Sequence, residues 1–285
     1  MKRAIVATAI AVSTSVLTIG AAHAAPGPHG HHAKRPTVRP PVSTPAVAQP
    51  AQPNAPGRGF TLDCTYSHSN TVDPIVMPGH VGMSHLHEFF GNTGTNENST
   101  GSSLLADGTT CNDAKNHSSY WIPALYQDGT YIAPKGMKVR YNVAPRGTTT
   151  AFPLGFMAVS GRTDTTAAWG CVSPGLRPVM SGAVATVPTC SGQSHLIAQV
   201  TFGECWDGTS LDSSNHMSHL VFATNGRCPT TNPVRVPQVR LTVDYPKAAS
   251  GGTGVTLSSG TAATLHGDIF EAWAGDALTQ RIASS

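Results

Sequence analysis

An even set of six cysteines, all beyond residue 60, constrains this chain's fold more than any other feature. An even count in an exported chain implies three disulfides, which staple a domain with many loops. Fifteen pairings are possible and the sequence does not choose among them. We favour neighbour pairing: Cys64 with Cys111, Cys171 with Cys190, and Cys205 with Cys228. Metal ligation by these thiolates is disfavoured, because no Cys-x-x-Cys pair is present.

The first 24 residues have the layout of a secretory signal peptide. Lys2 and Arg3 give a positive start, an uncharged and mostly apolar run follows, and Ala22-His23-Ala24 offers small residues at a cleavage site. A retained membrane anchor is the alternative, but the run is rich in Ala, Thr and Ser and barely long enough to span a bilayer. We therefore expect a secreted, extracellular protein with no membrane association after cleavage.

Residues 25–57 form a Pro-rich spacer, and residues 58–285 form the globular domain. Nine prolines fall in the spacer, which favours an extended, semi-rigid segment. Its histidines His29, His31 and His32 are better interpreted as solvated low-complexity sequence than as a metal site. The net charge of +3 comes without a basic run or an aromatic ladder, so nucleic acid is not an expected partner. We expect a monomer.

The domain lacks sustained helical periodicity. Its regular pieces are short and β-like, and Gly, Asn, Asp and Pro turn signals separate them. The pattern predicts a mainly β fold, a single disulfide-stapled β-sandwich or distorted barrel with long loops. We also expect a short helix near Ala272–Ile282. The predicted strands are Met137–Val143, Leu154–Val159, Leu196–Phe202, His219–Ala223 and Val236–Val243.

The distribution of histidine indicates a metal site. Two histidines two residues apart on an extended segment point to the same face, and a pair three residues apart meets in a tight loop. Several convergent imidazoles are costly to bury without a cation, and neutral imidazole ligates copper and zinc. We therefore predict a copper or zinc site from three separate segments. Its predicted ligands are His85, His87, His216, His219 and His266.

Three carboxylates lie close to these histidines in sequence. Asp212 and Asp268 are candidates to orient the ligands through hydrogen bonds from outside the coordination sphere. Glu88 adjoins the histidine pair and is the candidate catalytic residue, a general base for a water molecule at the site. Lone histidines such as His117 and His195 are interpreted as structural.

Other chemistries lack their motifs. No Gly-x-Ser-x-Gly elbow, dinucleotide loop or phosphate loop is present, so neither a serine hydrolase of that type nor a nucleotide-binding protein is expected. Several aromatic residues could stack on sugars, although each is more often part of a core. They are Tyr120, Trp121, Tyr126, Trp206 and Trp273.

Taken together, these stretches resemble a family of secreted bacterial and fungal proteins, DUF1996, whose function is unknown. The closing segment departs modestly from the His-Ala-Asp-Phe-type string of related sequences. The resemblance implies an extracellular single domain and no particular reaction. The matching stretches run in family order over about 200 residues: Asp73–Val76 with Pro78–Gly79, Ser84–Asn92, Thr109–Cys111, Ser119–Tyr126, Cys205–Gly208, His216–His219, Cys228–Pro229 and His266–Phe270 with Trp273.

The leading functional hypothesis is a secreted metal-binding protein. An enzymatic role on an extracellular polymer, such as a polysaccharide, is the next hypothesis, and the reaction could be hydrolytic or oxidative. The alternatives are a non-catalytic carbohydrate-binding or cell-wall-binding module and an extracellular metal scavenger. Loss of turnover on chelation would distinguish the enzyme from both alternatives.

Overall fold

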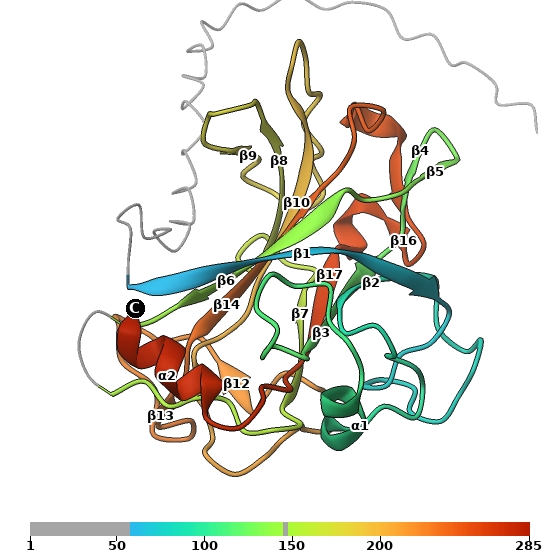
Figure 1. The fold of residues 1–285 in the computed structure, drawn as a ribbon. Helices are drawn as coiled ribbons and strands as arrows, with labels where there is room; N and C mark the ends of the chain where they lie inside the picture. Colours follow the sequence, from blue (N-terminus) through green and yellow to red (C-terminus); the bar gives the residue numbers. More distant parts are fainter. Residues whose placement is uncertain (1–57, 145–147) are drawn as a thin grey trace, which may run out of the picture. The chain divides into compact units, whose positions relative to one another are not determined.

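The computed structural model describes residues 58–144 and 148–285. The expected signal peptide and spacer, residues 1–24 and 25–57, lie outside these ranges. The mainly β prediction is confirmed, because a curled ten-stranded antiparallel sheet organises the domain (Figure 1). In spatial order its strands are β7 (Met157–Gly161), β17 (His266–Phe270), β3 (Ser119–Pro123), β2 (His87–Gly91), β1 (Gly59–Asn70), β6 (Gly136–Asn142), β14 (Gln238–Asp244), β10 (His195–Thr201), β8 (Ala167–Val172) and β9 (Val179–Met180).

Strand β1 joins the two halves of this sheet. Its first half pairs with β6 from Gly59 to Thr65, and its second half pairs with β2 from Tyr66 to Asn70. The register shifts between Tyr66 and His68, where a bulge redirects the strand from one partner to the other. β1 therefore belongs to both sides of the sheet. On one side it pairs with β6, which leads to β14 and β10, and on the other it pairs with β2, which leads to β3, β17 and β7.

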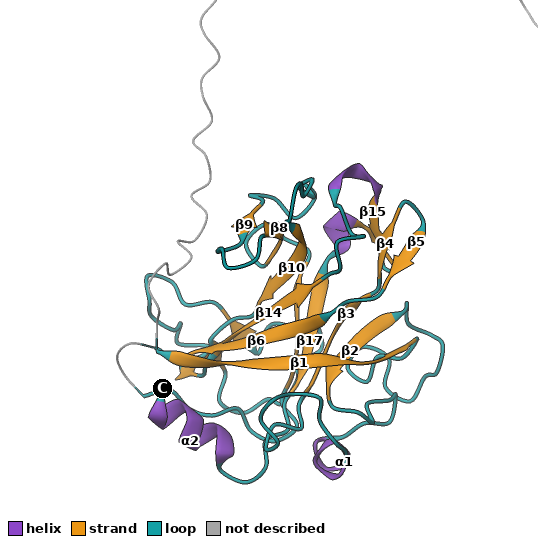
Figure 2. Cartoon of the chain, turned by 45° about the horizontal axis from the view of Figure 1, so that its top comes forward, coloured by secondary structure: helices purple, strands orange, loops and turns teal. Residues whose placement is uncertain are grey.

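Two smaller sheets and a few helical turns complete the domain (Figure 2). The helices α1 and α2 lie at the periphery of the large sheet in this view. The three-stranded sheet contains β12 (Leu220–Val221), β11 (Cys205–Trp206) and β13 (Val234–Arg235), and the four-stranded sheet contains β16 (Gly260–Thr261), β15 (Val255–Leu257), β4 (Leu125–Gln127) and β5 (Thr130–Ile132). The helical segments are α1 (Gly101–Ala106), α2 (Ala277–Ser284), η1 (Gly252–Gly254) and η2 (Ala262–Thr264).

Both faces of the β2–β3–β17–β7 side are buried. Because successive side chains of a strand point to opposite faces, Tyr120 and Ile122 of β3 join the main core, whereas Trp121 points to the other face. There it packs with Phe89 in a second core that includes Val72, Ile75, Leu104, Phe270 and Ala272. Residues 71–118 contribute much of this second core. His87 of β2 and His266 of β17 lie on the same face of the sheet.

The three disulfides join sequence neighbours, the pairing that we favoured. The bonds are Cys64–Cys111, Cys171–Cys190 and Cys205–Cys228. Cys64 lies on β1, so its bond attaches the loop before β3 to the centre of the sheet. Across residues 58–144 and 148–285, no helix is long and apolar enough to cross a membrane.

Candidate metal centre

His85 and His87 approach one another where the chain enters β2. Their ring centroids are 4.2 Å apart. The carbonyl of Leu86, between them, accepts hydrogen bonds from Ala124 N (3.0 Å) and Ser258 Oγ (2.5 Å). These contacts hold the segment extended, so that both imidazoles face the same way, as their spacing predicts.

His266 reaches the pair from the first position of β17. Its ring centroid lies 5.1 Å from that of His85 and 5.9 Å from that of His87. One ring nitrogen from each of the three residues lies within 4.8 Å of the others. Nitrogens around a tetrahedral zinc ion, each 2.0–2.1 Å from the metal, would be about 3.3 Å apart. Small side-chain rotations would therefore bring the three imidazoles to coordination distance.

Backbone carbonyls orient two of the three rings. His87 donates its Nδ1–H to Val72 O at 3.0 Å, and His266 donates its Nδ1–H to Thr264 O at 2.8 Å. Each bond fixes the tautomer in which Nε2 carries the lone pair, as is usual for histidines that bind metals. The Nε2 atoms of His85 and His87 are buried and have no hydrogen-bond partner among the described residues.

The same environment keeps these imidazoles neutral. Burial lowers the pKa of His87 well below 6.5, and the nearby His85 adds to the effect. Burial also lowers the pKa of His266 to about 4, and lowers that of His85 with a further contribution from Arg162. Since only a deprotonated ring nitrogen ligates a metal, the shifts favour the binding-competent form.

Asp268 lies on the same strand as His266, but it makes no hydrogen bond to a clustered histidine in the described residues, so its expected orienting role stays a prediction. It follows His266 by two residues on β17, so the two side chains share a face about 7 Å apart. The carboxyl is completely buried, and neither oxygen has a hydrogen-bond partner among the described residues. Burial, and next the negative charge of Asp73, raise the pKa of Asp268 well above its usual value. Trp121 Nε1, across the β17–β3 pairing, is also buried and unpartnered. This concentration of unsatisfied polar atoms is typical of a ligand site.

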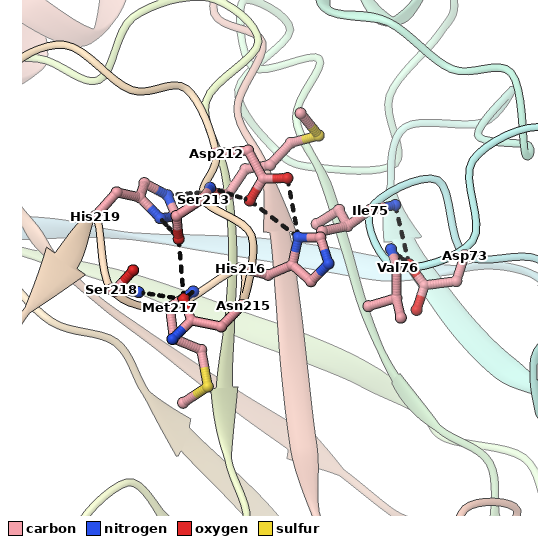
Figure 3. Close-up of polar contacts among 11 residues, drawn as sticks. Asp73, Ile75, Val76, Asp212, Ser213, Asn215, His216, Met217, Ser218 and His219 are labelled. Atoms are coloured by element: carbon pink, nitrogen blue, oxygen red, sulfur yellow. Dashed lines mark hydrogen bonds and ion pairs between the residues drawn. The ribbon is translucent and has the colours of Figure 1, made fainter.

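The other two predicted ligands lie outside this group. His219 donates Nε2–H to Met157 O at 2.7 Å, and its Nδ1 accepts from Ser213 Oγ at 2.8 Å (Figure 3). Both nitrogens are thus occupied. His216 is held by Asp212, whose carboxylate oxygens lie 3.0 and 2.9 Å from its Nδ1. Among the described residues, the predicted five-histidine set is therefore reduced to His85, His87 and His266, whose ring nitrogens lie together.

Glu88 does not face the three histidines. Adjacent residues of a strand point to opposite faces, and the Glu88 carboxylate accepts a hydrogen bond from Ser69 Oγ at 2.9 Å on the other side of β2. Burial raises its pKa, while Ser69 and Tyr131 act in the opposite direction. The general-base role expected from sequence adjacency lacks the geometry that it requires.

The expected aromatic platform is largely internal. Tyr120, Trp121 and Trp273 are buried in the two cores, and Tyr126 and Trp206 are half-buried. The lone histidines have structural partners: His117 Nδ1 bonds Asp107 O, and His195 pairs with a carboxylate of β14.

Two residues near the cluster were not assigned a role from sequence. Asp73 is buried and accepts hydrogen bonds from the backbone of Ile75 and Val76, both at 3.0 Å. Arg162 follows β7 directly and acts electrostatically on His85 and His266. Asp73 lies in a stretch that carried the family resemblance, but no sequence pattern marked Arg162.

Comparison with known proteins places the domain in a family. No curated protein and no solved structure matches the chain. One family model, described as a domain of unknown function, matches residues 73–273, which include all three clustered histidines. Because that match covers most of the chain, this protein belongs to the DUF1996 family, as its motifs led us to expect.

Proposed function

We propose that this domain binds a divalent transition-metal ion, zinc or copper, through His85, His87 and His266. The observation that carries the proposal is the convergence of three neutral imidazoles within 4.8 Å. Two of them are already oriented by backbone carbonyls. Burying such a group without an ion leaves polar nitrogens unsatisfied, and a metal ion removes that cost.

The ligand chemistry limits the choice of ion. Three imidazoles and a nearby carboxyl suit zinc and copper, whereas calcium and magnesium prefer all-oxygen sites. The order of intrinsic affinities favours copper wherever copper is available. A competition titration with both ions is the measurement that distinguishes them.

A catalytic role on an extracellular polymer is the finer proposal. Catalytic zinc sites typically use three protein ligands and keep one position for water or substrate, whereas structural sites are closed by four. A cavity of about 330 Å³ reaches His266, which would give a substrate access to the ion. The cavity favours an enzyme over a scavenger, and the three disulfides are consistent with the expected extracellular location.

Elemental analysis of the natively secreted full-length protein tests metal binding. We expect about one equivalent of zinc or copper in the wild type, and loss of that metal in a His85→Ala/His87→Ala variant. His80→Ala is the matched control, because its side chain is exposed and lies five residues before His85. Unchanged metal content in the double variant would overturn the proposal. Circular dichroism would establish that each variant is folded.

A screen on extracellular polysaccharides tests the finer proposal. For an enzyme we expect turnover that disappears on chelation and returns with the ion. Tight metal binding without any turnover would indicate a scavenger. Glycan binding that survives metal removal would indicate a binding module.

A further inference from the structure

The cavity that reaches His266 has an unusual electrostatic composition. Its lining includes Arg162 and His216 but no carboxylate. We propose that this cavity binds an anionic group, a carboxylate, phosphate or sulfate of the substrate, with Arg162 as the residue that binds the oxyanion. This inference rests on the proposed function, because it places the substrate next to the metal ion.

Arg162 is held at the cavity by a constrained backbone. It adopts φ = 63°, a left-handed conformation that is uncommon for residues other than glycine. Its N–H donates to Leu265 O at 2.7 Å, and the preceding Gly161 pairs with His266 across the β7–β17 ladder. Backbone conformations of this kind cluster at binding sites, where the surrounding structure stabilises them. The connection to β17 fixes Arg162 relative to a metal-binding residue.

The guanidinium of Arg162 has no hydrogen bond or ion pair within residues 58–144 and 148–285. Its positive charge contributes to the lowered pKa of His85 and His266. A charge that disfavours a proton on these rings also disfavours a metal cation there. An anion bound between the guanidinium and the ion would compensate both charges, and the planar guanidinium can hold an oxyanion through two parallel hydrogen bonds.

Asn215 supplies a second donor to the cavity. Its Oδ1 accepts hydrogen bonds from Met217 N and Ser218 N, at 3.2 and 2.9 Å. These bonds fix the amide orientation and leave Nδ2–H available to a ligand. His216, beside it, has its Nδ1 engaged by Asp212, and its ring lies between Asp212 and the turn at Asp73–Val76 (Figure 3).

Two acids near Arg162, Asp73 and Asp268, do not line the cavity. Both are buried, and burial raises the pKa of each, while the positive charge of Arg162 acts in the opposite direction. A second hollow of about 370 Å³ shares Asn215 and Met217 with the first, and no charged side chain lines it. The two hollows together suit a ligand with an anionic group near the ion and a neutral remainder beyond it.

Calorimetric titration of the full-length protein, zinc-loaded and metal-free, tests the inference. The probes are inorganic phosphate, sulfate and glucuronate, which also distinguish phosphoryl, sulfuryl and carboxylate groups. We expect at least one anion to bind the zinc-loaded wild type. Arg162→Asn should weaken it about tenfold or more, because a charge-assisted bidentate contact is lost while asparagine tolerates the backbone conformation. Arg162→Lys should lie between the two, because it keeps the charge without the planar fork.

Arg177→Asn is the matched control, since Arg177 is also exposed and lies outside both cavities. It should bind the anion like the wild type. Zinc affinity should be equal or higher in Arg162→Asn, which shows that the variant is folded. Absence of binding by all three anions, or equal binding by Arg162→Asn and wild type, overturns the inference. If zinc itself does not bind, the proposed function fails, and the metal-free titrations still decide whether Arg162 binds anions.

Discussion

At the residue scale, hydrogen bonds to the ring distinguish His87, a candidate metal ligand, from His219. His87 uses only Nδ1, which leaves Nε2 unpartnered, whereas His219 uses both nitrogens within the protein. Both rings are buried, so burial alone does not separate a ligand from a structural residue. The difference lies in the second ring nitrogen, which no sequence spacing specifies.

Asp268→Asn should change stability and metal affinity in opposite directions. The wild-type carboxyl is buried without a hydrogen-bond partner in the described structure, and its raised pKa shows that ionisation is disfavoured. Replacing it by a neutral amide of similar shape should stabilise the metal-free protein at pH 8 by about 1–3 kcal/mol. The same change should weaken zinc binding about tenfold or more, because a bound zinc ion favours the ionised carboxylate and asparagine cannot supply that negative charge. Urea unfolding and a zinc competition titration measure the two effects, and a variant that binds zinc as tightly as wild type contradicts this role.

The pH dependence of metal binding should be shallow. An imidazole with a pKa near 6.5 competes for protons below neutral pH and loses up to about tenfold in affinity per pH unit. The lowered pKa of His85 and His87, and the value of about 4 for His266, shift this competition to more acidic solution. We expect less than about a threefold change in zinc affinity from pH 7 to pH 5.5, and a steep fall only below that range. A hundredfold loss between pH 7 and 5.5 would show that the rings titrate normally.

At the element scale, the contact between β7 and β17 places His266. Gly161 adopts φ = 122°, and a Cβ at this position would lie 2.5 Å from both His266 Cα and Leu265 O. Both of these atoms belong to β17, which carries the proposed ligand His266, or lead directly into it. Only glycine permits this approach, so the sequence at 161 determines where the third imidazole lies.

Gly161→Ala should therefore impair metal binding together with stability. We expect the free energy of unfolding to fall by about 3 kcal/mol or more, since a backbone clash adds to the conformational strain. Gly175→Ala is the control, because its φ is 73° but nothing lies within 4 Å of an added Cβ. It should cost about 1–2 kcal/mol and leave zinc binding intact. Equal zinc affinity in both variants would show that the close contact does not position His266.

Elements with strong local patterns were predictable, and elements defined by distant partners were not. The alternation of Val239, Leu241 and Val243 predicted β14, which spans Gln238–Asp244. The strand predicted at Leu154–Val159 begins later, as β7 at Met157–Gly161, because a turn at Leu154-Gly155 precedes it. The long strand β1 was missed. The alternation of Phe60, Leu62, Cys64 and Tyr66 with polar residues marks its first half, whereas its second half, residues 67–70, is polar throughout and is a strand through its pairing with β2.

The same distinction applies to the candidate site. The spacing of His85 and His87 predicted a shared face, and the structure adds His266 to it. Glu88 was chosen for adjacency, but strand geometry points neighbouring side chains to opposite faces. The occupied nitrogens of His219 depend on Met157 O, contributed by a different strand. Arg162 gave no sequence signal, because only the β7–β17 contact brings it close to His266.

At the scale of the whole molecule, a buried acid, Glu271, links β6, β3 and the segment after β17. Glu271 follows β17 and accepts hydrogen bonds from Tyr141 OH at 2.8 Å and Trp273 Nε1 at 3.1 Å. Tyr141 in turn bonds Tyr120 OH at 2.8 Å, so β6, β3 and the segment after β17 meet in one polar network. Burial raises the pKa of Glu271 to about 7, although Tyr141, Ser118 and Trp273 stabilise the ionised form.

This network should make the stability of the whole domain depend on pH. In the unfolded chain the Glu271 carboxyl titrates near 4.5, so between pH 4.5 and 7 the folded state binds more protons than the unfolded state. Stability from this group is therefore greatest below pH 4.5 and falls as the pH rises through this window, by about 3 kcal/mol in total. The lowered pKa of His87 and His266 makes stability rise with pH instead, since those rings bind protons more readily when unfolded.

Comparing the stability of wild type with that of Glu271→Gln isolates the contribution of this carboxyl, because the variant keeps every other titrating group. We expect the stability advantage of wild type over Glu271→Gln, from urea unfolding, to shrink by about 2–3 kcal/mol between pH 5 and pH 7. Glu97→Gln, outside the network, should show no such trend, and a pH-independent difference for Glu271→Gln would mean that this carboxyl is ionised throughout the range.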